Sequence, residues 1–128
     1  MATGFPASTG DVLSAAMFNG LVAFTVTTQS GATYTVANTD LYQVAILTSN
    51  ASTKTITIAP DSTLTSAAAG SAITFINTGA GLLTFAAGAG VTIVSAGATS
   101  AAPTLAQYRS AVAIRQSANS WIIVGAIA

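Results

Sequence analysis

At 128 residues, of which 52% are hydrophobic, the chain has the size of one domain and is too apolar to remain disordered. Only 5% of the residues are charged, three Lys and Arg against three Asp, so no basic stripe is available to bind nucleic acid. The apolar runs end well before the roughly 20 residues of a membrane-spanning helix, and the first residues lack the features of a secretory signal, so neither membrane insertion nor export is expected.

Residues 1–20 differ from the rest of the chain and predict an N-terminal arm with a short helix. A Ser N-cap, three helix-tolerant residues and an Asn-Gly stop signal follow one another there. Leu13, Met17 and Phe18 would share one face of a helical turn that is too short to be stable alone. We therefore expect this arm, together with Phe5, to dock on the body of the protein or on a neighbouring subunit.

Residues 21–128 predict one β-sandwich domain. Short segments rich in β-branched residues are separated by Gly, Pro, Asn and Ser turns at the intervals of a sandwich or barrel. Alternation is clearest where Ile56 and Ile58 face inward and Thr55 and Thr57 face outward. We expect an all-β, antiparallel β-sandwich or barrel, jelly-roll-like, of about 8–10 short strands. The segments are 21–28, 33–36, 42–48, 53–58, 71–77, 82–86, 91–95, 109–116 and 121–127.

Side chains for catalysis are scarce in this sequence. Without His or Cys, neither a zinc site nor a His-activated nucleophile can be built. Asp11, Asp40 and Asp61 are far apart in the chain, and capping and turn roles explain them better than an aspartate dyad. The Gly pairs at 79/81 and 88/90 lack the third Gly, the Lys and the helix of a phosphate loop. We expect no catalytic residue, no metal site, no cofactor and no enzymatic activity.

Two sets of residues in the sequence could form a surface that binds a ligand. Trp121, Tyr34, Tyr42 and Tyr108 would suit a sugar platform, but three of the four lie in strand patterns, which favours packing in the core or at a subunit interface. Thr-x-Thr repeats at 25–27, 33–35, 53–57 and 63–65 would suit an ice-binding array. Their spacing is irregular, with no fixed period to link them, so ordinary solvent-facing strand positions are the preferred interpretation.

The last two predicted strands contain three candidate interface residues. Arg109 and Arg115 lie six residues apart in one strand and so share a face. Because burying either without a partner is costly, we expect both at a rim, where they reach an acidic group on a neighbouring protein or simply solubilise the surface. The strand that begins at Trp121 is apolar on both faces, as expected of a central strand or of one covered by another subunit.

The scarcity of charge predicts lasting contact with other subunits. Interface cores are depleted in charged residues, and a formal net charge of zero provides no repulsion between copies. We therefore expect a homo-oligomer. The candidate assembly residues are Phe5, Leu13, Met17, Phe18, Arg109, Arg115 and Trp121.

Two passages resemble virion proteins of tailed bacteriophages. MATGFPASTGDVLSAAMFNGL is similar to the openings of small virion proteins, and ITFINTGAGLLTFAAGAGVTIVSAG, with the segment 105–109 and the Trp121 strand, is similar to a β-module of tail and head-surface proteins. The resemblance implies a virion location and symmetric oligomers, most often trimers, and supplies no catalytic residues.

Because the sequence contains no collagen-like, coiled-coil or long shaft segment, the resemblance favours a capsid decoration protein. Such a protein binds the major capsid protein, or another virion protein, on the outer surface of the head and stabilises it. The alternative is a tail-fibre or head-fibre module that binds a receptor or carbohydrate.

Overall fold

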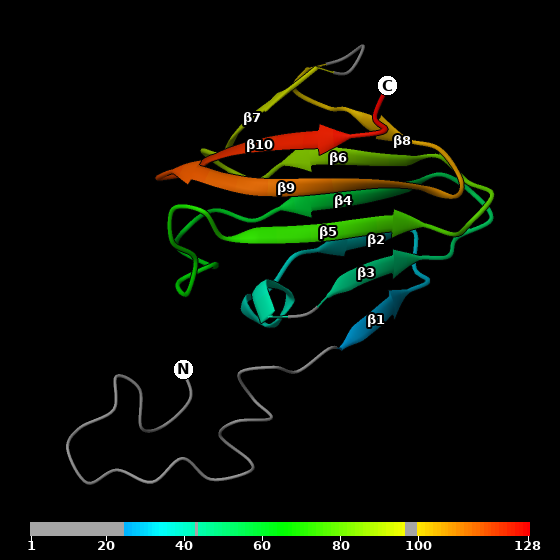
Figure 1. Cartoon of the computed structure of the whole chain (residues 1–128), viewed down its shortest axis with the longest axis horizontal. Helices are drawn as coiled ribbons and strands as arrows, with labels where there is room; N and C mark the ends of the chain where they lie inside the picture. Colours follow the sequence, from blue (N-terminus) through cyan, green and yellow to red (C-terminus); the bar gives the residue numbers. More distant parts are fainter. Residues whose placement is uncertain (1–24, 43, 97–99) are drawn as a thin grey trace, which may run out of the picture.

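The computed structural model describes residues 25–42, 44–96 and 100–128. These residues form ten strands in two packed sheets and one 3-10 helix, η1 (Asn38–Tyr42) (Figure 1). The six-stranded sheet has the order β1 (Val26–Gln29), β3 (Ala45–Thr48), β5 (Ala72–Asn77), β9 (Arg109–Ser117), β10 (Ser120–Gly125) and β7 (Thr92–Ser95). The four-stranded sheet has the order β2 (Thr33–Thr35), β4 (Lys54–Ile58), β6 (Leu83–Ala87) and β8 (Thr104–Leu105). The predicted N-terminal arm and its helix lie outside the described residues.

The first six strands form a two-sheet coil. They alternate between the sheets, and each strand from β3 to β6 lies parallel to the strand two places earlier in the chain. Because β7 is also parallel to β10, five of the eight pairings between described strands are parallel. The predicted all-β sandwich is confirmed. The predicted antiparallel, jelly-roll-like pairing is wrong, because the two sheets contain both parallel and antiparallel pairs. Consecutive strands that belong to opposite sheets are not hairpins, so the chain returns in the same direction on each turn.

The hydrophobic core fills the space between the two sheets. Ile46, Phe75 and Trp121 point inward from the six-stranded sheet, and Ile56 and Phe85 meet them from the four-stranded sheet, all of them fully buried. The rings of Phe75 and Phe85 meet edge to face, with centroids 5.0 Å apart and planes at 70°. Alternate positions in β4 are buried, which confirms the predicted inward direction of Ile56 and Ile58.

Stacked turns explain the Gly-rich segment after β5. The amide of Gly81 donates to the carbonyl of Asn50 at 3.0 Å, and the amide of Thr78 donates to that of Thr48 at 2.7 Å. The turn after β5 therefore lies directly on the turn after β3. A Cβ atom on Gly81 would lie 1.7 Å from the carbonyl oxygen of Ser52. Gly is required there because two backbones approach closely, and not because the chain reverses in a hairpin.

Replacing Gly81 with Ala is expected to lower the free energy of unfolding by about 1–3 kcal/mol, because the two stacked turns must move apart. Urea unfolding followed by circular dichroism measures the loss. Gly31→Ala is the matched control, because a Cβ atom there would meet only the Thr33 carbonyl oxygen, at an ordinary 3.6 Å. Equal losses in the two variants would contradict the role of close turn stacking.

Candidate assembly surface

The outer surface of the six-stranded sheet carries a set of Leu, Ile and Val side chains, with Thr28, Thr74 and Ser110 among them. Strand register aligns Leu47 with Ile76, Val112 with Val124, and Ile114 with Ile122 and Val94. We call these seven residues the apolar face. Inward residues beside them, such as Ile46, Phe75 and Ile123, are buried, whereas Val94, Val124 and Ile114 are exposed and the other four are half-buried. Side chains that alternate with a buried set point away from the core, so this face is directed outward.

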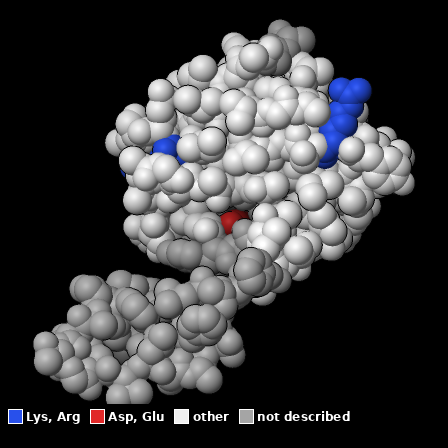
Figure 2. Space-filling model, viewed as in Figure 1, with Lys and Arg blue, Asp and Glu red and all other residues white. Residues whose placement is uncertain are grey.

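The apolar face contains no charged side chain in the described strands. Arg109 and Arg115 are the charged residues of the six-stranded sheet, and they align with Asn77 and Trp121, whose side chains point inward. In Figure 1 this sheet lies in front, and Figure 2 shows the same view as an almost uncharged surface, with blue at its sides and one small red area. The face has no charge with which to hold water or repel a second apolar surface.

Two of the few charged residues lie inside the molecule. Lys54 is 2% exposed, and its ammonium donates to the carbonyl oxygen of Gly31. Burial lowers the pKa of Lys54 because desolvation penalises the charged form. Asp40, also 2% exposed, accepts from the hydroxyl of Tyr34 at 2.6 Å and from the amide of Ala37 at 2.8 Å. Burial raises the pKa of the Tyr34 hydroxyl, and the bond to Asp40 raises it further.

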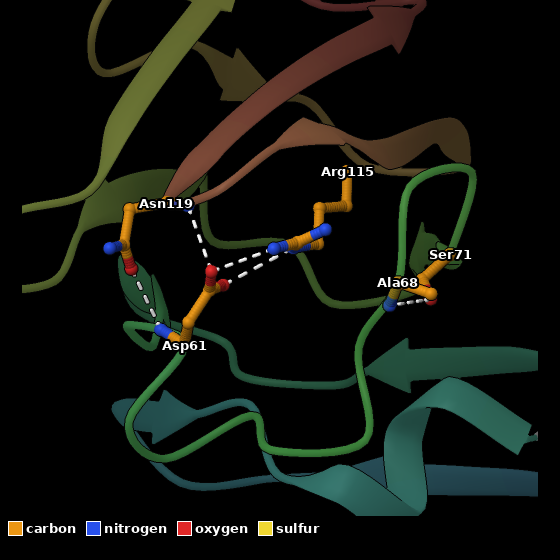
Figure 3. Close-up of polar contacts among 5 residues, drawn as sticks. All are labelled: Asp61, Ala68, Ser71, Arg115 and Asn119. Carbon is orange, nitrogen blue, oxygen red and sulfur yellow. Dashed lines mark hydrogen bonds and ion pairs between the residues drawn. The ribbon is translucent and has the colours of Figure 1, made fainter.

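Arg115 forms an ion pair within the chain (Figure 3). Its Nη2 and Nε donate to the two carboxylate oxygens of Asp61 at 2.7 and 3.2 Å. The backbone amide of Asn119 also donates to that carboxylate, at 3.1 Å. The side-chain oxygen of Asn119 accepts from the backbone amide of Asp61 at 2.8 Å. These bonds tie the loop after β4 to the β9–β10 hairpin. The expectation that Arg115 reaches a neighbouring protein is therefore corrected, because its partner is 54 residues away in the same chain.

The ion pair makes the stability of the fold depend on pH in the acidic range. Hydrogen bonding to Arg115 holds the pKa of Asp61 below its usual value, so the contribution is present above the unfolded pKa of about 3.9 and is lost as pH falls through the folded pKa. At pH 7, Asp61→Asn is expected to unfold at a lower urea concentration than the wild type. The difference between the two unfolding midpoints is expected to shrink at pH 3. Arg109→Gln is the control that removes an exposed charge. A pH-independent difference would contradict the ion pair.

The remaining candidate residues, Arg109 and Trp121, lie in different environments. Among the charged residues that the structure describes, Arg109 alone is exposed. It follows Tyr108, which is 77% exposed. Trp121 is 0% exposed, so it packs the core and does not form an interface. Its indole nitrogen has no hydrogen-bond partner in the described chain. With Trp121 buried and Tyr34 bonded to Asp40, these aromatic side chains do not form a sugar platform.

Four of the candidate assembly residues belong to the predicted N-terminal arm. Phe5, Leu13, Met17 and Phe18 lie outside the described residues. The role of the arm in assembly therefore remains a sequence-based prediction. Within the described ranges, no three His, Cys, Asp or Glu side chains gather where they could hold a metal ion, and no helix is long and apolar enough to cross a membrane.

A second regular surface includes residues of two Thr-x-Thr repeats, 33–35 and 53–57, which the sequence had assigned to ordinary solvent-facing strand positions. The outer side of the four-stranded sheet aligns Thr33, Thr55, Thr84 and Thr104 in one row across all four strands. Thr35 and Thr57 stand beside them in a second row. We call these six residues the threonine face. The parallel pairing of β2, β4 and β6 and the antiparallel pairing of β8 bring them together across connections of unequal length, so a search for a fixed repeat does not find them.

Comparison with known proteins gives no family assignment. No family model, curated protein or solved structure matches the chain.

Proposed function

We propose that this chain is a non-enzymatic structural subunit that assembles with copies of itself through the apolar face. The observation that carries the proposal is a sheet surface of seven Leu, Ile and Val side chains without a charge in the described strands. In a sandwich, the positions that alternate with the core are polar where water covers them. Apolar side chains at these positions favour cover by another protein surface.

The other outer surface provides an internal comparison. The outward positions of the four-stranded sheet are mostly Thr, whereas those of the six-stranded sheet include many Val, Ile and Leu beside residues such as Thr74 and Ser110. A general bias of the whole sequence toward apolar residues would affect both sheets equally. The difference between the two surfaces therefore supports a specific role for the apolar face.

A second copy of the same chain suits this surface. The apolar face offers no charge that an acidic or basic partner could complement. The net charge of zero means that copies do not repel one another. Binding would then depend on apolar burial, which is insensitive to salt screening.

The sequence resemblance supports capsid decoration as the setting of this assembly. In that role an oligomer binds the major capsid protein on the outer surface of the phage head and stabilises the shell. Arg109, exposed beside Tyr108, is available for a polar contact with such a partner. The oligomer number that the resemblance implies is most often three.

The two-sheet coil favours a fibre module as a second candidate. β1 and β2 are the edge strands of their sheets, and both belong to the first turn of the coil. β2 has a strand partner on one side only among the described strands, so a further turn of β-structure from another chain could stack against it. Repeated stacking of this kind would build a shaft, as a fibre module requires.

Solution mass is the first test of the proposal. Light scattering at low and high salt is expected to show the same oligomer, because few charges hold it together. A monomer at high protein concentration would contradict assembly. Imaging of purified phage particles then separates the two settings: repeated sites across the shell support decoration, and density restricted to fibres supports the second candidate. Particles without the protein would exclude both.

A further inference from the structure

The threonine face is a regular two-row array. Thr33 pairs with Thr55, Thr55 with Thr84, and Thr84 with Thr104, so one row crosses β2, β4, β6 and β8 without interruption. In the second row Thr35 pairs with Thr57, which pairs with Ala86. The intervening residues of β4 and β6, such as Ile56 and Phe85, are buried in the core. The Thr side chains therefore project from the opposite side of the sheet.

Strand geometry fixes the spacing of the array. Neighbouring strands lie about 4.8 Å apart, and residues two positions apart along a strand are separated by roughly 6.7 Å. Thr is β-branched and has a restricted χ1, so each hydroxyl and methyl group keeps a defined direction. The array thus presents hydroxyl and methyl groups at two regular intervals, instead of a flexible polar surface.

The six hydroxyl groups are available to solvent. Thr33 and Thr35 are exposed, and Thr55, Thr57, Thr84 and Thr104 are half-buried. None of the six makes a side-chain hydrogen bond within the described residues, whereas Thr48 and Thr78 do. Unpaired hydroxyls at fixed positions hold first-shell water molecules at corresponding positions.

The chemistry of this face excludes the usual polymeric ligands. Lys54, the charged residue of the four strands, points inward, so charged polymers find no complement on these strands. The aromatic Phe85 also faces the core, which removes the stacking surface that a sugar chain uses. An uncharged lattice of alternating hydroxyl and methyl groups matches a ligand that is itself an ordered hydrogen-bonded lattice. Ice is such a solid, and the oxygen rows on its faces repeat at comparable intervals.

We propose that the threonine face binds ice by ordering water along its two rows of hydroxyl and methyl groups. This function goes beyond assembly and does not depend on it, because the two faces lie on opposite sides of the sandwich. Subunits joined through the apolar face would keep the threonine face open. A homo-oligomer would therefore present several ice-binding faces at once, and their combined attachment would be stronger than that of one copy.

Partition into slowly growing ice tests this proposal. The purified full-length chain is mixed with serum albumin, and the fraction of each protein inside the ice is measured. The chain is expected to enter the ice in clear excess over albumin. Thr55→Tyr, which places a ring in the middle of the long row, is expected to fall to the albumin level. Thr63→Tyr is the matched control, since Thr63 is exposed in the turn after β4, and it is expected to behave as the wild type.

Two further measurements separate loss of ice binding from loss of folding or assembly. Thermal unfolding of each variant shows whether Thr55→Tyr still folds, which is expected because Tyr is well suited to an outward strand position. Solution mass reports assembly separately, so a failure of ice binding leaves the proposed function untouched. Wild-type protein excluded from ice as fully as albumin would overturn the inference. So would folded Thr55→Tyr protein that enters ice as well as the wild type.

Discussion

Val124→Lys is expected to convert the assembled protein into monomers, whereas Thr35→Lys is expected to leave it assembled. Val124 lies on the apolar face opposite Val112 and is 45% exposed in the single chain. A Lys at this position is solvated in the monomer but buried without a partner in the assembly. An uncompensated buried charge costs roughly 3–5 kcal/mol, so the dissociation constant should rise by more than two orders of magnitude.

Thr35→Lys is the matched control for this experiment. It introduces the same charge at an exposed outward position on the other sheet, so it changes net charge equally without touching the apolar face. Sedimentation over a range of protein concentrations measures the dissociation constant of each variant, and circular dichroism confirms the fold. Dissociation of both variants would show that net charge, and not the apolar face, controls assembly. Persistence of both assemblies would exclude this face as the interface.

The positions of most strands could be predicted from the sequence. Each of the nine predicted segments overlaps a strand of the described chain, because alternation of buried and exposed residues is a local property. In β4 the order of Lys54 to Ile58 already determines which side chains are buried. β8 escaped detection because it has two residues, and η1 because its signal is short and polar.

Strand direction could not be predicted in the same way. A Gly-rich turn such as Thr78 to Gly81 is compatible with a hairpin and with a crossing to the opposite sheet, and local sequence does not distinguish them. The close contact of Gly81 with Ser52 becomes visible only when the two turns are stacked. Antiparallel pairing was therefore the natural expectation, and the parallel coil depends on contacts between residues distant in the chain.

The partners of the charged residues could not be predicted from the sequence either. Arg115 and Asp61 lie 54 residues apart, and nothing near either residue indicates the other. The low content of charge predicted a covered surface, but it did not reveal that Lys54 and Asp40 are themselves buried. The described surface is consequently poorer in charge than the composition indicates, which strengthens the reason to expect assembly.

Lys54→Met is expected to stabilise the protein at pH 7, by an amount on the order of 1–4 kcal/mol, as when buried charged groups are replaced by apolar side chains of similar volume. Among the described residues, Lys54 has one hydrogen-bond acceptor, the carbonyl of Gly31, for three ammonium protons. Its inward position beside the core suits the unbranched side chain of Met. Urea unfolding at one fixed protein concentration measures the gain, since assembly also affects apparent stability.

The pH dependence identifies the ammonium as the cause. Burial lowers the folded pKa of Lys54, so the unfolded chain holds the proton more tightly and the wild type gains stability as pH rises toward the unfolded pKa of about 10.4. The advantage of Lys54→Met should therefore shrink between pH 7 and that value. Arg109→Met removes an exposed cation and should change stability by less than about 0.5 kcal/mol. An advantage of Lys54→Met that stays constant with pH would instead assign the gain to packing, and the buried charge would then carry no penalty.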